Sequence, residues 1–207
     1  AEKSFEVLVG KGTQAITWAD VPSKTYGDDP FNVSASSSSA LSVGYEVVSG
    51  PATIEGAKVT LSGAGTVVLR AKQGGNDNWN GAAALKSLEV VKAAQAITFG
   101  YLAGREFTSE PIQLGASSSS GLSVVYEVMK GEATVFGDEL TLTGVGEVTV
   151  RAKHLGTANY LAASAVDRTF TVSQGTQSVE IVLGQQISWQ SDPVEVGLKS
   201  SSGLKAF

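Results

Sequence analysis

The sequence contains no cysteine and only one histidine. The absence of cysteine excludes disulfides, thiolate nucleophiles and cysteine-based metal sites. The folded state must therefore be held together by apolar cores, and a chain of 207 residues is long enough to build more than one.

Clusters of basic residues are also missing. The 15 basic and 20 acidic side chains give a net charge of −5, and no group of Lys or Arg stands out along the chain. Such a surface is a poor match for nucleic acid or anionic membranes, so we expect neither as a partner. No apolar run reaches the roughly 18 residues of a membrane span, and we expect no membrane insertion in this segment. The first residues lack the charged and apolar regions of a signal peptide, so any export signal would lie outside them.

What the sequence does contain is an internal repeat. Residues 14–85 align without a gap on residues 95–166, at an offset of 81, and both copies begin Gln-Ala-Ile-Thr. A third copy begins at Gln177 and stops at Phe207, less than halfway through a repeat. Self-similarity over this length is typical of tandem domains, because each copy is large enough to bury its own core.

The repeat defines the domain boundaries that we predict. They are a terminal strand of a preceding repeat at 1–12, a first repeat at 13–93, a second repeat at 94–175 and an incomplete third repeat at 176–207. Residues 3–7 match the strands that close the two full copies, so we expect both ends to be cuts through a longer array. The junction at 90–95 has no Pro/Gly/Ser linker and should allow little freedom, whereas the next junction contains Gly175 and should bend more.

Short alternating runs rich in Val, Thr and Ser, separated by turn residues, predict an all-β fold of tandem immunoglobulin-like β-sandwich domains, with about 81 residues and seven strands per repeat. The strands of the first copy are expected near 15–21, 30–37, 41–48, 52–55, 58–62, 66–72 and 85–91. Glycines that recur between strands, such as Gly50 and Gly131 or Gly63 and Gly144, are expected to provide a positive φ or a tight reversal.

The candidates for chemistry are few. The lone histidine, His154, corresponds to Gln73 in the first copy, and no triad partner can be proposed for it. The serine runs at 36–39 and 117–120 have no neighbouring base, so we interpret them as strand ends that turn into the next strand. Asp28 and Asp29 are not matched in the second copy by a calcium-type run of carboxylates. We therefore expect no enzyme activity, no cofactor and no metal.

Charged residues recur at Glu46, Arg70 and Lys72, and again at Glu127, Arg151 and Lys153. The strand alternation turns them outward, which favours a cross-strand salt bridge. An internal Lys–Asn isopeptide bond is disfavoured, because that reaction needs a buried, neutral amine. A ligand patch is a third interpretation that the sequence does not separate from the first.

An aromatic residue recurs at one loop position, as Trp79 beside Asn78 and as Tyr160 beside Asn159. These four residues are the candidate ligand contacts, because an exposed ring beside amide groups suits a sugar. The alternative is structural: the ring folds back to close the end of its sandwich, and the asparagine supports the turn. Recurrence in both copies favours the structural interpretation.

Several motifs of the first copy are distinctive. They are Gln-Ala-Ile-Thr-Trp at 14–18, Lys-Thr-Tyr-Gly-Asp-Asp-Pro-Phe at 24–31, Ser-Gly-Pro-Ala-Thr at 49–53, Val-Thr-Leu-Ser-Gly-Ala-Gly at 59–65 and Arg-Ala-Lys-Gln-Gly-Gly-Asn-Asp-Asn-Trp at 70–79. With these motifs the chain resembles the bacterial immunoglobulin-like (Big/MBG-type) tandem repeats of very long secreted and cell-surface proteins. The second copy departs from the pattern at 105–110, where the Tyr-Gly-Asp turn is lost.

The resemblance implies an extracellular or cell-surface location in a bacterium and a non-enzymatic role as a spacer or adhesive stalk. Its first partners would be the neighbouring repeats of the same chain. Two other functions stay open: an adhesion module that binds a cell-surface glycan or protein through its loop aromatics, and a strand-exchange filament in which residues 3–9 complete another molecule.

Overall fold

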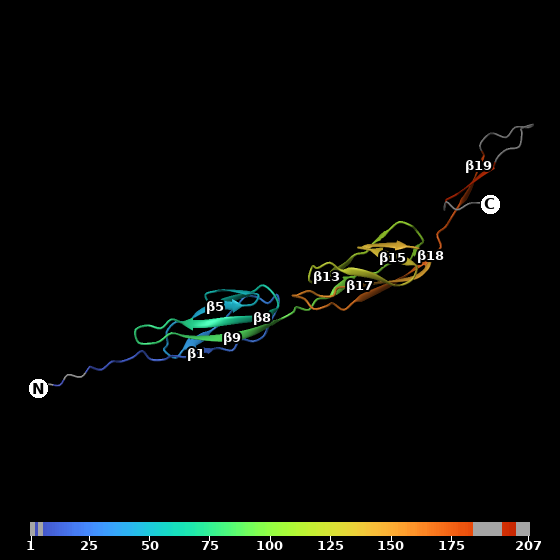
Figure 1. Ribbon diagram of the computed structural model, residues 1–207. Helices are drawn as coiled ribbons and strands as arrows, with labels where there is room; N and C mark the ends of the chain where they lie inside the picture. The colour runs from blue at the N-terminus through green and yellow to red at the C-terminus, as the bar shows by residue number, and fades with distance from the viewer. Residues whose placement is uncertain (1–2, 4–5, 184–195, 202–207) are drawn as a thin grey trace, which may run out of the picture. The chain divides into compact units, whose positions relative to one another are not determined.

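The computed structural model describes residues 3, 6–183 and 196–201. The chain divides into two compact units. The first unit comprises residues 1–96, 118–122 and 154–164, and the second comprises residues 97–117, 123–153 and 165–207. The described chain is all-β and contains no helix, and hence none that could cross a membrane. Figure 1 shows the strands of each unit.

The first unit contains two main sheets and one strand pair. A four-stranded sheet has the order β2-β9-β8-β5, a three-stranded sheet has the order β3-β7-β6, and β1 pairs with β4. The bounds are β1 Ile16–Trp18, β2 Lys24–Thr25, β3 Phe31–Asn32, β4 Ala35–Ser37, β5 Gly44–Ser49, β6 Ala52–Glu55, β7 Lys58–Leu61, β8 Gly65–Gln73 and β9 Ala82–Val91.

Side-chain alternation builds the core of this unit. Along β8, Val67, Leu69 and Ala71 are fully buried, and the charged residues Arg70 and Lys72 belong to the alternate, outward-facing set. Val67 and Leu69 pack in one cluster with Val33 and with Val59 of the three-stranded sheet. A core shared by two sheets is the arrangement of a β-sandwich.

The second unit repeats the same strand order. Its sheets run β11-β18-β17-β14 and β12-β16-β15, and β10 pairs with β13. The bounds are β10 Ile97–Phe99, β11 Arg105–Glu106, β12 Ile112–Gln113, β13 Ala116–Ser118, β14 Val125–Lys130, β15 Ala133–Phe136, β16 Glu139–Leu142, β17 Gly146–Lys153, β18 Val166–Ser173, β19 Val179–Leu183 and β20 Val196–Ser200.

The beginning of the third copy also follows the repeat. In the pair β19–β20, Val179 lies opposite Ser200, just as Ile16 lies opposite Ser37 in β1–β4. The rest of the third repeat, at 184–195 and 202–207, lies outside the described residues.

Three details differ from the predicted strands. The expected strand at 30–37 is split, because Phe31–Asn32 pairs with β7 and Ala35–Ser37 pairs with β1, so the chain changes sheets at Val33. A further short strand, Lys24–Thr25, runs parallel to the end of β9. Residues 6–11, predicted to be the strand of a preceding repeat, are in no strand, and Gly12 forms only an isolated bridge.

The positive φ expected for a recurring glycine is confirmed at Gly50 and Gly131, where φ is +99°. A Cβ atom at either position would lie 2.3 Å from a backbone oxygen of the facing strand, that of Thr66 or Glu147. Both the dihedral angle and the close approach therefore require glycine at this turn. Gly63 has no positive φ, and its lack of a side chain instead leaves room for Asn159.

Candidate functional site

The loop that carries Trp79 is held by main-chain bonds to the segment that enters the first repeat. The amide of Gly12 donates to the carbonyl of Asn78 over 2.8 Å, and the amide of Asn80 donates to the carbonyl of Gly12 over 2.9 Å. Inside the loop, Asn76 Oδ1 accepts from the amides of Asn78 and Trp79. The turn is thus built by an Asx motif and is then held by the segment that enters the repeat.

The loop that carries Tyr160 has the same construction. Ala93 takes the place of Gly12, donating to the carbonyl of Asn159 and accepting from the amide of Leu161, both over 2.9 Å. Thr157 Oγ1 replaces the asparagine oxygen and accepts from the amides of Asn159 and Tyr160 over 3.2 Å. Lys92 Nζ adds a bond to the Thr157 carbonyl. Both loops are therefore held by the same pair of main-chain hydrogen bonds to the entering segment, which we call the main-chain grip. The side chains that cap the two loops differ.

The surroundings of the two loops differ. Loop 157–161 lies within the first unit, where the Tyr160 ring meets the Tyr26 ring edge to face, with centroids 5.4 Å apart. Asn159 Oδ1 accepts from the amide of Ala64 over 3.0 Å. A Cβ atom on Gly63 would lie only 3.1 Å from the same oxygen, so glycine leaves room for the asparagine to approach.

Trp79 and Asn78 have no such contacts. The Trp79 ring lies against Gly12, where an added Cβ atom would sit 3.0 Å from its Cζ3 atom, and Asn78 is exposed. Of the four candidate ligand contacts, Asn159 and Tyr160 contact Ala64 and Tyr26 of the first repeat. The side chains of Asn78 and Trp79 have no hydrogen-bond partner among the described residues. Tyr160 packs on a residue of the first copy, which differs from the predicted closure of its own sandwich.

The glutamine that opens each repeat organises the serine run. Gln14 Oε1 accepts from the hydroxyls of Ser37 and Ser39, each over 2.5 Å. Gln95 Oε1 likewise accepts from Ser118 and Ser120, over 2.7 and 2.6 Å. The predicted interpretation of the serines as strand ends and turns is confirmed, and their hydroxyls fasten the first strand of each repeat.

His154 belongs to the same network. Its Nδ1 atom accepts from the amide of Gly156 over 3.0 Å and lies 2.9 Å from Gln95 Nε2. In the first copy, Gln73 Oε1 accepts from the amide of Gly75 and from Gln14 Nε2. The histidine is a structural acceptor that replaces a glutamine oxygen.

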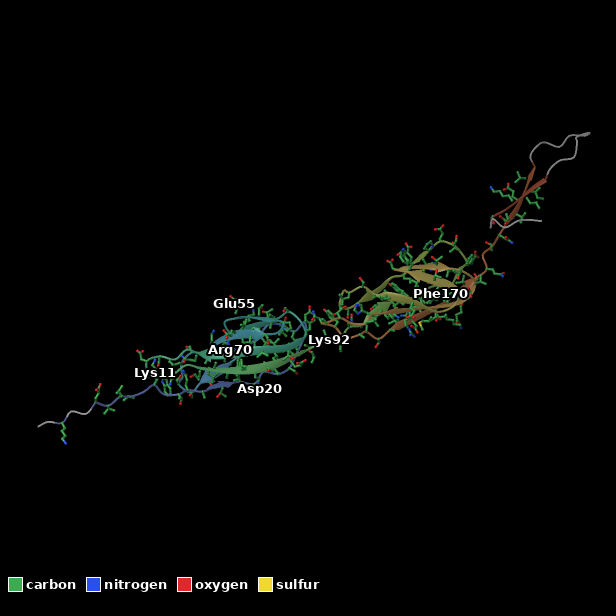
Figure 2. The ribbon with its side chains drawn as sticks, viewed as in Figure 1. Lys11, Asp20, Glu55, Arg70, Lys92 and Phe170 are labelled. Carbon is green, nitrogen blue, oxygen red and sulfur yellow. The ribbon has the colours of Figure 1, made fainter. Side chains whose placement is uncertain are left out.

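The predicted cross-strand salt bridges are confirmed in full in the first copy, on the outer face of its four-stranded sheet. Glu46 pairs with Arg70 over 2.8 Å and with Lys72 over 2.6 Å. Arg70 is labelled in Figure 2. The hydrogen bond from Lys72, followed by the positive charges of Lys72 and Arg70, holds the pKa of Glu46 below its ordinary value despite the opposing effect of desolvation.

The second copy divides the same charges differently. Glu127 pairs with Lys153, and Arg151 makes two bonds to Asp167, over 2.7 and 2.9 Å. The hydrogen bond from Arg151 is the largest cause that lowers the pKa of Asp167. Asp167 lies opposite Arg151 where Leu85 lies opposite Arg70 in the first copy. Its carboxylate therefore binds the arginine of the second copy, and the equivalent arginine of the first copy binds Glu46 instead.

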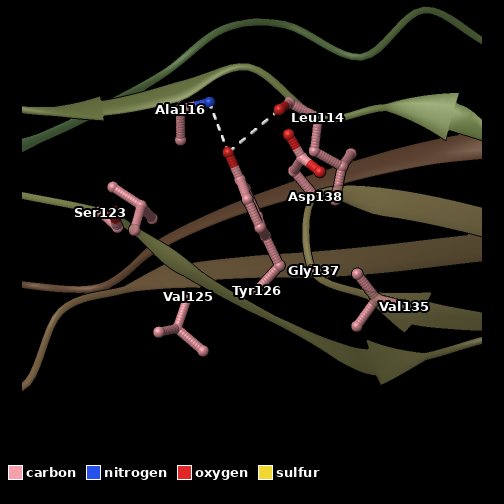
Figure 3. Close-up of a pocket in the computed structure, with 9 residues that line it drawn as sticks. Leu114, Ala116, Ser123, Val125, Tyr126, Val135, Gly137 and Asp138 are labelled. Carbon is pink, nitrogen blue, oxygen red and sulfur yellow. Dashed lines mark hydrogen bonds between the residues drawn. The ribbon is translucent and has the colours of Figure 1, made fainter.

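A pocket of about 480 Å³ opens beside Tyr126 in the second unit. Figure 3 shows the Tyr126 hydroxyl between two main-chain groups: it accepts from the amide of Ala116 over 2.7 Å and donates to the carbonyl of Leu114 over 3.2 Å. Tyr45 makes the equivalent bond to Ala35 in the first copy, over 2.8 Å. Both hydrogen-bonding directions of the Tyr126 hydroxyl are used to hold the strand.

Sequence reasoning located the loops but missed the residues that receive loop 157–161. Tyr26 and Ala64 are separated from their partners by more than ninety positions, and no local pattern links them. The recurrence of Gly63 and Gly144 was the only sequence feature that marked this place. It predicted a turn, and it did not predict that a side chain approaches the backbone there.

No protein-family model and no curated protein sequence matches the chain. Among solved structures, the chain is similar to Drosophila N-cadherin EC1-3, with 13% sequence identity and a TM-score of 0.31. That match covers 80% of this chain and 69% of the cadherin chain.

Proposed function

We propose that this chain is a non-enzymatic spacer segment of a long bacterial surface or secreted protein, built from tandem immunoglobulin-like domains. In this role each repeat adds length to the protein, and the first partners of each repeat are its neighbouring repeats. An extracellular location is part of the proposal, since a surface array is where such distance is useful.

The observation that carries the proposal is the main-chain grip on the segment that enters each repeat. Gly12 and Ala93 each use both their N–H and their C=O group to bond the loop of the repeat that follows. Ala93 follows β9 by two residues, so the last strand of one repeat runs into this grip without a flexible linker. A grip that uses backbone groups limits bending at the junction, which is what a spacer requires.

The immunoglobulin-like assignment has its own support. Each full copy has two main sheets of the same strand order. In both copies a tyrosine hydroxyl, that of the partly buried Tyr45 or the buried Tyr126, accepts from the amide of the alanine that begins β4 or β13. The ion pairs lie on the exposed faces of the sheets, where they contribute to a solvated surface and leave the core apolar.

Backbone ¹⁵N relaxation on the intact chain tests the proposal. We expect the amides at 92–96 to be as ordered as those of β9, and the amides at 174–177, which include Gly175, to be more mobile. Order at 92–96 as low as that of an exposed loop would contradict a spacer function. Detection of a turned-over substrate would contradict the non-enzymatic part.

A further inference from the structure

Asn80 and Gly81 form the only Asn–Gly pair in the sequence. They lie where loop 76–80 meets β9, and both residues are exposed. The second copy has Leu161 and Ala162 at these positions, so the pair belongs to the first repeat alone. A side-chain carboxamide next to a glycine amide is a reactive combination, because glycine has no Cβ atom to hinder closure of a ring between them.

The exposure of this pair does not depend on what precedes the repeat. Leu161 holds the place of Asn80 in loop 157–161, which contacts the first repeat through Asn159 and Tyr160. Leu161 is nevertheless 51% exposed. A preceding repeat that contacted loop 76–80 in the same way would therefore leave Asn80 open to water.

The amide of Gly81 is available as a nucleophile. It donates to no described residue, whereas the amides of the three residues before it are all bonded. The Asn80 side chain is held only weakly, because its one hydrogen bond to the described residues, from Nδ2 to the carbonyl of Lys11, is 3.3 Å long. Rotation of the carboxamide toward the Gly81 nitrogen breaks no stronger contact.

Gln14 acts on the peptide group that joins the two residues. Its Nε2 atom donates to the Asn80 carbonyl over 2.6 Å. When the Gly81 amide loses its proton, the negative charge is shared with that carbonyl oxygen, so the donor stabilises the attacking form. After ring closure the same bond polarises this carbonyl and favours attack of water there. Gln95 makes the equivalent bond to Leu161 over 2.7 Å, where there is no carboxamide to react.

We propose that Asn80–Gly81 is a site of spontaneous deamidation, with isoaspartate as its main product. The Gly81 nitrogen bonds to Cγ of Asn80 and the Cγ–Nδ2 bond breaks, so ammonia leaves with the proton that the Gly81 amide gave up. Water then adds to the main-chain carbonyl of the succinimide and breaks its bond to the Gly81 nitrogen. The product has an additional main-chain atom and an additional carboxylate between the loop and β9, which loosens the main-chain grip on Gly12 as the protein ages.

Storage of the intact folded chain in warm, mildly alkaline buffer tests the proposal, with peptide mapping by mass spectrometry and isoaspartyl methyltransferase labelling as readouts. Storage continues until a reference sample unfolded in guanidinium chloride has deamidated at Asn80. We expect the folded chain to deamidate there as well, with isoaspartate as the main product and with Asn76 and Asn78 unchanged. Deuterium exchange of the Gly12 amide should be severalfold faster in the aged chain. A folded chain that keeps Asn80 intact overturns the proposal.

Two variants test the groups that assist the reaction. Gly81→Ala introduces the residue of the second copy and should slow deamidation at Asn80 severalfold, because a Cβ atom hinders ring closure. Gln14→Glu keeps oxygens that accept from the serine hydroxyls but cannot donate to the Asn80 carbonyl, so it should lower both the rate and the share of isoaspartate. Trp18 fluorescence verifies that each variant is folded. An unchanged rate in Gly81→Ala overturns attack by that amide, and unchanged rate and product in Gln14→Glu overturn the role of Gln14.

The second copy offers a matched gain-of-function control. The double variant Leu161→Asn/Ala162→Gly places the reactive pair beside Gln95, whose bond to the carbonyl at 161 is already present. We expect this loop to deamidate at a rate close to that of Asn80 in the same molecule. A second loop that stays intact while Asn80 reacts would contradict assistance by the glutamine.

Discussion

Loops 76–80 and 157–161 are the two most instructive regions to compare. They share an offset of 81 residues, the same capping pattern and the same grip on the entering segment. Only the second has partners in the other repeat: Asn159 accepts a hydrogen bond from Ala64, and the Tyr160 ring contacts the Tyr26 ring. The comparison separates what a repeat specifies for itself, the loop conformation, from what it acquires through a neighbouring surface, a hydrogen bond and a ring contact.

The largest effect is expected in the cores, where the two copies should behave alike. Leu69 and Val150 are equivalent and fully buried. Leu69→Ala should destabilise the first unit by about 2–5 kcal/mol, and Val150→Ala should destabilise the second by about 2 kcal/mol, since it removes less volume. Urea unfolding checks this, with Trp18 fluorescence for the first unit and β17 amide signals for the second. Equal shifts of both transitions in each variant would show that the cores are not separate.

The second-largest effect on stability should differ between the two loops. Asn159→Ala leaves the Ala64 amide without its acceptor and should destabilise the first unit by about 1 kcal/mol. The matched variant Asn78→Ala removes no side-chain hydrogen bond to the described residues and should change stability by less than about 0.5 kcal/mol. Unfolding followed by Trp18, together with hydrogen exchange of the Ala64 amide, measures both. Equal losses in the two variants would argue against this difference between the loops.

A smaller effect tests the interchange of histidine and glutamine. His154→Gln restores the residue of the first copy and should change stability by less than about 0.5 kcal/mol, because Gln73 Oε1 already accepts the equivalent glycine amide. His154→Ala removes the acceptor and should cost about 1 kcal/mol. Thermal unfolding of the two variants gives the ranking. A glutamine variant as unstable as the alanine variant would contradict a shared acceptor role.

The smallest effect concerns the ion pairs. The pKa of Glu46 is lowered in the folded state, so its pair contributes stability above the unfolded pKa, and this contribution is lost as pH falls through the folded pKa. A carboxyl NMR titration should show a midpoint for Glu46 below the ordinary value of a glutamate, and Lys72→Met should raise that midpoint. High salt should also raise it, because salt screens the two positive charges. A Glu46 midpoint that does not change in Lys72→Met at low salt would contradict the pairing.

The strand pattern of the two full copies could be predicted because it depends on local alternation. The buried and outward positions along β8 follow from the period of two, and the pairing of Glu46 with Arg70 and Lys72 follows from the outward phase. The sheet change at Val33 was missed, because a continuous alternating run gives no sign that its two halves pair with different strands.

The candidate site was predictable only in part. The recurrence of an asparagine and an aromatic ring marked both loops correctly. Their partners could not be found, since the approach of Asn159 to Ala64 joins residues ninety-five positions apart. The role of Gln14 was equally hidden, although its recurrence with Ser37 and Ser39 reflected a real hydrogen-bond requirement.

The grip on Gly12 and Ala93 has a consequence for how such a chain evolves. The loop bonds to the N–H and C=O groups of one residue, which is glycine at the first joint and alanine at the second. The hydrogen bonds of a duplicated repeat therefore do not depend on which side chain that residue carries. The ring of the loop limits the size of the side chain, since a Cβ atom on Gly12 would lie 3.0 Å from Cζ3 of Trp79. Copy number can change under this rule as long as the entering residue stays small.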